Sequence, residues 1–134
     1  MNRNITVKII MPSDIIFEAE AKMINIPGEE GFFSVLFGHA RFISTVAIGC
    51  ISVFLDSEEK KFFVYKGIAR VTPIEVCITS EFVVFLEGQD KNDVLSKISS
   101  FESELKSLKN NKLDSIILED ILSKYNSLLN FICK

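Results

Sequence analysis

The chain offers few side chains that could carry out catalysis. His39 is the only histidine, so any nucleophile–histidine pair would have to use it, and a histidine-rich metal site is excluded. The nearest nucleophile types are Ser34, Ser44 and Cys50, and none of them lies in a Gly-x-Ser-x-Gly elbow. We therefore expect His39 to be a loop or interface residue, and we expect a non-enzymatic protein without a metal or a cofactor.

Two adjacent carboxylates, Glu29 and Glu30, could in principle act as an acid/base pair. Neighbouring residues on an extended chain point to opposite faces, however, so an exposed acidic corner is the better interpretation. The sequence also lacks a Gly-rich loop followed by Lys-Ser/Thr and lacks Gly-x-Gly-x-x-Gly, which are the standard phosphate cradles. The residues themselves thus predict no active site.

Charge and cysteine content narrow the class of protein. The net charge of −3 arises in residues 1–88, with 8 basic against 11 acidic side chains, while residues 89–134 carry 7 of each. Neither part has a basic stripe, so we do not expect a nucleic-acid partner.

Cys50, Cys77 and Cys133 form no Cys-x-x-Cys pair and predict reduced thiols in a cytoplasm. The N-terminus lacks an apolar signal core, and no apolar run is long enough to span a membrane, so we expect neither export nor insertion.

Up to about Gly88 the apolar residues recur with a period of two, which is typical of strands. Ile5, Val7 and Ile9 alternate with polar residues, and a second strand is expected to run through Ala21, Met23 and Asn25. Ten of the twelve phenylalanines precede Gly88, as expected for a core between two sheets. This pattern predicts an all-β sandwich or barrel, interrupted at Met11–Asp14, Pro27-Gly28, Ala47–Gly49, a charged tip at residues 56–61, Lys66-Gly67 and Thr72-Pro73.

After Gly88 the apolar period becomes helical. Asp90 or Asp93 can cap a first helix and Asp114 a second, with a turn at Asn110-Asn111-Lys112 between them. The fold class is therefore α+β, with a β-sandwich over residues 1–88 and an antiparallel two-helix hairpin over residues 89–134. The residues expected to pack the hairpin are Val94, Ile98, Phe101, Leu105 and Leu108 on the first helix and Leu118, Ile121, Tyr125, Leu128 and Ile132 on the second.

The second helix carries more apolar residues than one partner helix can cover. Ile117, Leu122 and Leu129 widen its stripe beyond a simple seam. Two explanations remain open at this stage. Either the flank of the chain's own sandwich covers these residues, or they form a docking surface for another subunit.

The run from Pro27 to Ala40 resembles a signature of the epsilon subunit of bacterial F-type ATP synthase. It has a proline, an acidic residue before a glycine, and a short apolar run that closes in Gly-His-Ala. The similarity extends over nearly the whole chain and includes the stretches Met11–Ala21, Ile48–Ile51, Phe63–Val71 and Glu87–Asp90. Some positions depart from the family pattern, because Phe37, Arg41 and Ile48 stand where proline is usual and Lys66-Gly67 replaces Gly-Gly.

The resemblance implies a non-catalytic rotor subunit of the proton-translocating ATP synthase, in the central stalk. Its sandwich would grip the gamma shaft and rest on the polar loops of the c-ring, on the cytoplasmic face of the bacterial inner membrane as a peripheral protein. Its hairpin would lie folded or extend toward the alpha/beta head to restrain ATP hydrolysis. The residues that the resemblance places at the c-ring are Glu29, Glu30, Gly31, Phe32, Gly38, His39 and Arg41. In the alternative, Phe32 and Phe33 both fill the sandwich and the two glutamates only solvate the turn.

Two features of the tail bear on regulation. Some family members bind ATP through Asp-x-x-Arg-Ala at the start of the first helix, and the matching positions here are Asn92, Leu95 and Ser96, so nucleotide sensing is not expected. The tail has no net charge, and only Lys106, Lys109 and Lys112 cluster, which predicts weak or absent inhibition. A stand-alone two-domain adaptor and a small β-barrel enzyme or ligand carrier remain as alternative classes.

Overall fold

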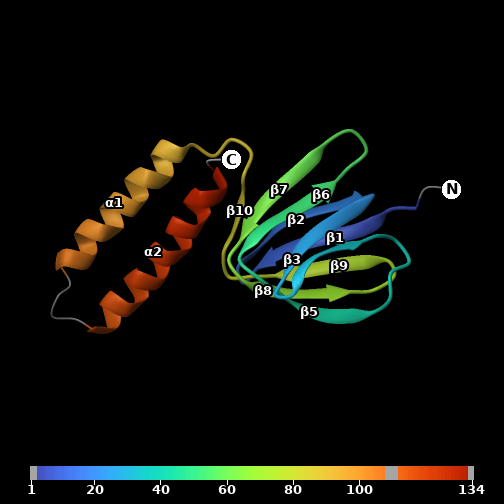
Figure 1. The fold of residues 1–134 in the computed structure, drawn as a ribbon, viewed down its shortest axis with the longest axis horizontal. Helices are drawn as coiled ribbons and strands as arrows, with labels where there is room; N and C mark the ends of the chain where they lie inside the picture. Colours follow the sequence, from blue (N-terminus) through green and yellow to red (C-terminus); the bar gives the residue numbers. More distant parts are fainter. Residues whose placement is uncertain (1–2, 108–111, 133–134) are drawn as a thin grey trace. The chain divides into compact units, whose positions relative to one another are not determined.

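The computed structural model describes residues 3–107 and 112–132 and divides into two compact units, Met1–Glu87 and Gly88–Lys134 (Figure 1). The first unit contains all ten strands and the second contains both helices. The α+β class expected from the sequence is therefore confirmed. The strands are β1 (Ile5–Met11), β2 (Asp14–Ala21), β3 (Met23–Gly28), β4 (Gly31–Val35), β5 (Phe42–Val46), β6 (Gly49–Phe54), β7 (Glu59–Val64), β8 (Gly67–Val71), β9 (Glu75–Thr79) and β10 (Val83–Phe85).

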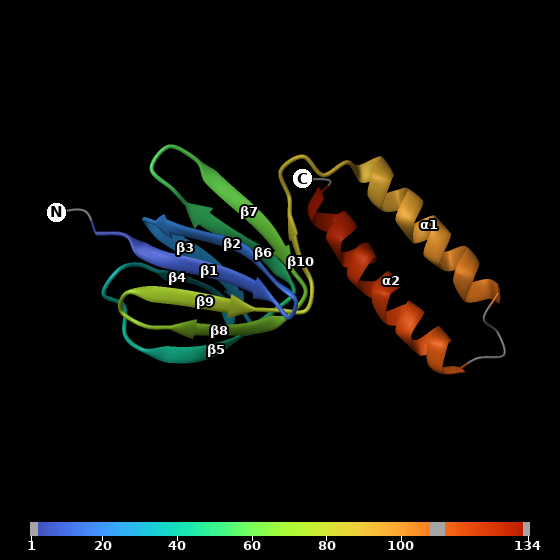
Figure 2. The same cartoon turned by 180° about the vertical axis from the view of Figure 1, so that it is seen from behind.

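The strands form one hydrogen-bonded path that folds back on itself. Their order is β10-β7-β6-β3-β5-β8-β9-β1-β2, and β4 pairs with β3 beside this path. Every pairing is antiparallel except that of β1 with β9, which is parallel. In Figures 1 and 2, β1, β8 and β9 lie in one layer and β3, β6 and β7 in the other. The result is the predicted β-sandwich.

The core lies between these layers and is built by strand alternation. Ile5, Val7 and Ile9 of β1 are completely buried, while Thr6 and Lys8 between them are only partly covered. Each apolar side chain of this size stabilises the folded state by roughly 1.5–3 kcal/mol when it leaves water. The same alternation places buried residues on the inner faces of the other strands, including Ile24, Ile26, Ile51, Val53, Phe62, Val76 and Ile78.

Two details of the strands differ from the sequence-based expectation. The chain bends at Lys22, so Ala21 ends β2 opposite Ile5, and Met23 begins β3 opposite Phe54. The expected continuous strand through Ala21, Met23 and Asn25 is therefore wrong. The bend shifts the alternation of buried residues by one position, so that Ala21 is buried before it and Ile24, rather than Met23, is buried after it. The shift arises because the chain leaves one layer for the other.

The expected charged tip at residues 56–61 is also shorter than predicted. Glu59, Lys60 and Lys61 already belong to β7 and lie opposite Phe54, Val53 and Ser52. The turn closes with a hydrogen bond from the amide of Leu55 to the carbonyl of Glu58, at 2.8 Å. The charged residues fit into a strand because their long side chains reach solvent, and Lys60 Nζ lies 5.2 Å from the ring centre of Phe85.

The second unit consists of α1 (Lys91–Ser107) and α2 (Lys112–Ile132), which run antiparallel to each other. Asp90 caps α1 as expected, because its Oδ1 accepts a hydrogen bond of 2.9 Å from the amide of Asn92. Asp114 lies in the first turn of α2, where an acidic side chain favours the helix dipole. Neither described helix has the length and hydropathy needed to span a lipid bilayer.

Most residues expected to pack the hairpin can be placed. Val94, Ile98, Leu118 and Leu128 are buried, and Phe101 contacts Tyr125 across the hairpin with ring centres 5.4 Å apart. Of the residues that widen the α2 stripe, Leu122 is buried, Leu129 is half-buried and Ile117 is exposed. Leu108, Asn110 and Asn111 lie outside the described residues. The remaining predicted packing residues, Leu105, Ile121 and Ile132, are half-buried.

Candidate functional site

The acidic corner predicted from the sequence is the tight turn between β3 and β4. Gly28 pairs directly with Gly31, and Glu29 and Glu30 form the exposed tip. Gly31 has a φ of 124°, which an L side chain rarely adopts. A Cβ on Gly28 would lie 2.9 Å from the carbonyl oxygen of Gly31 and 3.1 Å from the ring of Phe33. Both glycines are thus required for the turn that presents the two carboxylates.

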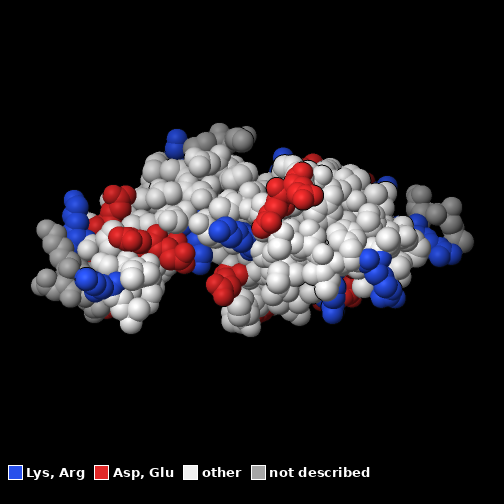
Figure 3. Space-filling view, turned by 60° about the horizontal axis from the view of Figure 1, so that its bottom comes forward, with Lys and Arg blue, Asp and Glu red and all other residues white. Residues whose placement is uncertain are grey.

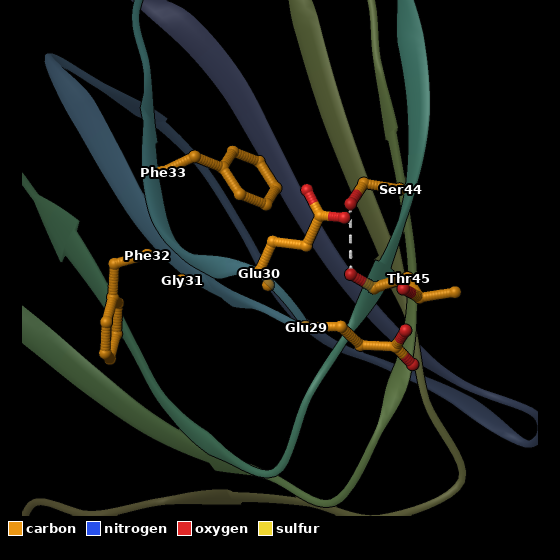
Figure 4. A pocket seen from close by; sticks show the side chains of 8 residues that line it. Glu29, Glu30, Gly31, Phe32, Phe33, Ser44 and Thr45 are labelled. Atoms are coloured by element: carbon orange, nitrogen blue, oxygen red, sulfur yellow. Dashed lines mark hydrogen bonds between the residues drawn. The ribbon is translucent and has the colours of Figure 1, made fainter.

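The corner borders an open pocket of about 400 Å³ against the end of β5. Figure 4 shows the Glu30 carboxylate pointing toward Ser44, with the Glu29 side chain beside Thr45. The Ser44 hydroxyl donates a hydrogen bond of 3.0 Å to the carbonyl of Thr45. The pocket is lined by Gly28, Glu29, Glu30, Gly31, Phe32, Phe33, Ser44 and Thr45. With carboxylates and hydroxyls at its rim, the pocket can accept hydrogen bonds and attract a cation, but it contains no nucleophile–base pair.

The two phenylalanines of β4 point in different directions. Phe32 is 69% exposed and lies opposite Pro27. Phe33 is half-buried and packs edge-on against Phe42, with ring centres 5.6 Å apart. The alternative in which both rings fill the sandwich is therefore wrong. An exposed ring beside two carboxylates forms a charged tip with an apolar flank.

The other predicted site residues lie in the loop from Leu36 to Arg41, between β4 and β5. Gly38 has a φ of 85° and its amide donates a hydrogen bond of 2.7 Å to the carbonyl of Pro73. The ring of His39 lies 5.2 Å from that of Phe42, and its Nδ1 is 3.2 Å from the carbonyl oxygen of Ala40. His39 is therefore linked to the corner through Phe42 and Phe33. Arg41 is not part of the corner pocket and instead lines a hollow at the opposite end of β5.

Sequence reasoning missed two exposed isoleucines near this site. Ile43 of β5 is 72% exposed and Ile68 of β8 is 54% exposed, and they occupy the outward face of adjacent strands. They lie opposite Arg70 and Thr45, respectively. Isoleucine in a strand ordinarily indicates the core. The signal that could have found them is the alternation in β5, where Phe42 and Val46 face inward and leave Ile43 outside.

The described residues outside the corner add little further chemistry. No group of three or more His, Cys, Asp or Glu among the described residues is arranged to hold a metal ion. Burial raises the pKa of the Cys50 thiol, more than the nearby Lys61 ammonium lowers it, so this thiol is protonated at neutral pH. Charges of both signs are interspersed over the face shown in Figure 3, without a broad field of one sign.

Together, these observations define a small protein of two units, a β-sandwich with an exposed acidic corner and a two-helix hairpin. The comparisons with known proteins identify the family. Residues 4–85 match the family model described as ATP synthase, Delta/Epsilon chain, beta-sandwich domain. The chain belongs to this family, and 78% of it is similar to an ATP synthase epsilon chain.

Individual relatives support this assignment. The ATP synthase epsilon chain of Rickettsia bellii is 34% identical over 108 residues, which cover 78% of this chain and all of that protein. The epsilon chain of a Bradyrhizobium species is 30% identical over 109 residues and 81% of each chain. A chain in the cryo-EM structure of the Euglena gracilis mitochondrial ATP synthase, with OSCP, F1 and c-ring, has the same fold. Its TM-score is 0.65 at 20% identity, and the match covers 93% of this chain and 79% of that one.

Proposed function

We propose that the chain is the epsilon subunit of a proton-translocating F-type ATP synthase and acts in the central stalk. In this role it is non-catalytic, binds the gamma shaft through the sandwich, and rests on the polar loops of the c-ring. It would be a peripheral protein on the cytoplasmic face of the bacterial inner membrane. Membership of the family supports the assignment, and the observation that carries the contact site is the exposed corner of Glu29, Glu30 and Phe32.

The physical properties of the sandwich suit the transmission of torque. Its core is continuous from β1 through β10, and closely packed interiors deform little under load. The corner is held by two glycines and by the packing of Phe33 on Phe42, so force applied at Glu29 and Glu30 passes directly into the core. At a protein interface, exposed charges orient the contact and a desolvated aromatic ring anchors it. Phe32 would be that anchor.

The hairpin would act, if at all, as a weak brake on ATP hydrolysis. Its net charge of zero provides little attraction to an acidic surface of the alpha/beta head. Asn92, Leu95 and Ser96 are exposed at the start of α1 and supply neither a carboxylate nor a guanidinium for ATP. Loss of a charge-assisted contact costs on the order of 1.5–3 kcal/mol, a tenfold to hundredfold loss of affinity. Calorimetric titration with ATP should therefore show no binding at submillimolar concentrations.

Charge reversal at the corner tests the proposal. We expect Glu30→Lys and Phe32→Ala to lower proton-driven ATP synthesis in reconstituted vesicles while leaving the fold intact, because exposed substitutions usually change stability by no more than about 0.5 kcal/mol. Glu81→Lys is the matched control, since Glu81 is an exposed carboxylate outside the corner. Circular dichroism and gamma pull-down verify folding and shaft binding for each variant.

The assignment of the corner is wrong if both variants synthesise ATP at the wild-type rate and retain the catalytic head on membranes. Failure of the wild-type chain to copurify with gamma would instead contradict the stalk assignment itself and favour a stand-alone adaptor.

A further inference from the structure

The last strand of the sandwich, β10, is a short edge strand at the end of the sheet. It has three residues, and each of them pairs with a residue of β7. Two backbone hydrogen bonds extend this ladder, from the amide of Tyr65 to the carbonyl of Phe82 at 3.1 Å and from the amide of Leu86 to the carbonyl of Lys61 at 2.9 Å. So few hydrogen bonds at an edge open at little cost, and β10 would fray without a further anchor.

Lys60 supplies this anchor from β7. It lies two residues before Phe62 and on the same face of the strand, so its alkyl chain points inward and only 25% of its side chain is exposed. Its Nζ lies 5.2 Å from the ring centre of Phe85 and 3.9 Å from the carboxylate of Glu87. The Phe85 ring packs in turn on Phe62, with ring centres 5.1 Å apart. One side chain therefore contacts the last residue of β10 and the last residue of the sandwich unit.

A second carboxylate distinguishes this contact from an ordinary surface ion pair. Glu58 Oε1 lies 3.4 Å from the same Lys60 nitrogen, so one ammonium group neutralises two carboxylates. Because both carboxylates surround one nitrogen, they are closer to each other than the screening distance of about 8–10 Å. Without the positive charge they would repel each other. Glu87 would then move away, since Glu58 is held in its turn by the hydrogen bond between its carbonyl and the amide of Leu55.

The chain loses its contacts directly after the anchored residue. Gly88 has a φ of 81°, and no atom of the described residues lies within 4 Å of the place where its Cβ would be. Gln89 and Asp90 are exposed, and α1 begins at Lys91. Residues 88–90 thus form the connection between Glu87 and the first helix.

We propose that Lys60 is a latch that closes the end of β10 and makes Gly88 the pivot between the two units. While the latch is closed, the backbone is ordered through Glu87 and rotation starts at Gly88. When it opens, residues 83–87 leave the sheet and lengthen the connection by about 16 Å, at a rise of about 3.3 Å per residue. A longer connection lowers the effective concentration of one unit at the other. The latch therefore controls how strongly the sandwich and the hairpin can influence each other.

The test is amide hydrogen exchange and backbone nitrogen relaxation, measured by NMR on the full-length chain. In wild type we expect the order parameter to stay high through Glu87 and to fall at Gly88. Lys60→Met keeps the apolar stem but removes the charge. We expect it to accelerate exchange of the Leu86 amide about two- to fivefold at low salt and to move the fall in order to residue 83 or 84. High salt should narrow the difference between this variant and wild type, because it screens the ion pairs.

Two matched variants isolate the charge of Lys60. Lys60→Arg restores a cation at the same place and should keep exchange close to wild type. Lys61→Met removes the neighbouring lysine, whose Nζ lies 3.6 Å from Glu59 and does not contact Glu87, so the Leu86 amide should exchange as in wild type. If circular dichroism shows that Lys60→Met is unfolded, Glu87→Gln replaces it and should accelerate the same amide.

The amide of Thr6, which donates to the carbonyl of Ile74 at 2.9 Å, reports on opening of the sandwich elsewhere. If Lys60→Met accelerates Thr6 as much as Leu86, the charge stabilises the whole sandwich and the latch is wrong. The latch is also wrong if order in wild type already falls before Glu87, or if Lys61→Met acts like Lys60→Met. These measurements use the isolated chain, so their outcome leaves the proposed binding to gamma untouched.

Discussion

At the scale of single residues, Gly67 is the position where the sandwich is least tolerant of a side chain. It begins β8, directly after Lys66, whose φ is 64°. A Cβ on Gly67 would lie 2.5 Å from the carbonyl oxygen of Thr79 and 3.1 Å from Cβ of Ser80. Ser80 is itself fixed, because its buried hydroxyl donates to the carbonyl of Lys66 and accepts from the amide of Phe82. The surrounding backbone therefore cannot move away easily.

We expect Gly67→Ala to destabilise the sandwich by about 1–3 kcal/mol, the usual cost of overpacking. Urea denaturation followed by circular dichroism measures this change. Gly88→Ala is the control, since Gly88 has a φ of 81° but no atom within 4 Å of its Cβ position, so only about 1–2 kcal/mol of backbone strain is expected there. If Gly67→Ala lowers the free energy of unfolding by less than Gly88→Ala does, the backbone near Thr79 has moved to relieve the contact.

Cys50 gives a prediction about pH. Burial raises the pKa of its thiol above its ordinary value in the folded state. The folded chain then binds the proton more tightly than the unfolded chain, so the stabilisation is present below the unfolded pKa and is lost as pH rises through the folded pKa. We expect the free energy of unfolding of wild type, relative to that of Cys50→Ala, to fall between pH 8 and pH 10.5, measured by urea denaturation. A constant difference would mean that the thiol is as accessible as in the unfolded chain.

At the scale of elements, an aromatic contact joins the two helices of the hairpin. Phe101 of α1 packs on Tyr125 of α2, and Lys97 Nζ lies 5.8 Å from the centre of the Tyr125 ring. We expect Tyr125→Ala to lose this pair, worth about 0.5–1.5 kcal/mol beyond the buried area, and to increase hydrogen exchange in α1 and α2. Amides of β1 and β9 serve as the internal control. Unchanged exchange in both helices would mean that other contacts close the hairpin.

The elements also show what the sequence could and could not predict. Alternation in Ile5–Ile9 and the helical period after Gly88 are local signals, and both gave the correct element. The bend at Lys22 was missed because it depends on Met23 finding β6 rather than β1 as its neighbour, which is a long-range pairing. Glu59–Lys61 were assigned to a turn because charge favours loops, whereas pairing with β6 overrides that preference.

The candidate site, too, could be predicted from the sequence only in part. The Glu29-Glu30 tip followed from adjacent carboxylates between two glycines, and the exposure of one phenylalanine followed from alternation. The exposure of Ile43 and Ile68 was missed, because the alternation in β5 separates two faces that both carry apolar residues and does not by itself say which face is buried. The separation of Arg41 from the corner also required the structure, since only three-dimensional placement shows at which end of β5 each residue lies.

At the scale of the whole molecule, the division at Gly88 predicts that residues 1–88 fold and bind gamma alone. Both Asp90 and the helices lie beyond this point, and all sheet pairings lie before it. Truncation after Gly88 should therefore leave a soluble domain that pulls down gamma with wild-type yield. The full-length chain is the positive control, and the same domain with Gly67→Ala is the destabilised comparison. An insoluble product, or one that fails to bind gamma, contradicts either the boundary or the location of the gamma surface.

The parallel pairing of β1 with β9 has a consequence for the order of events during synthesis. When β1 and β2 emerge from the ribosome they can form a hairpin, but the second edge of β1 stays open until residues 75–79 appear. The nascent chain thus exposes an unpaired strand edge while residues 22–74 are synthesised, which is a template for aggregation and a target for ribosome-associated chaperones. Pairing of β1 waits for β9, and β10 must still pair with β7 after it, so the domain can reach its native state only near the end of its own translation.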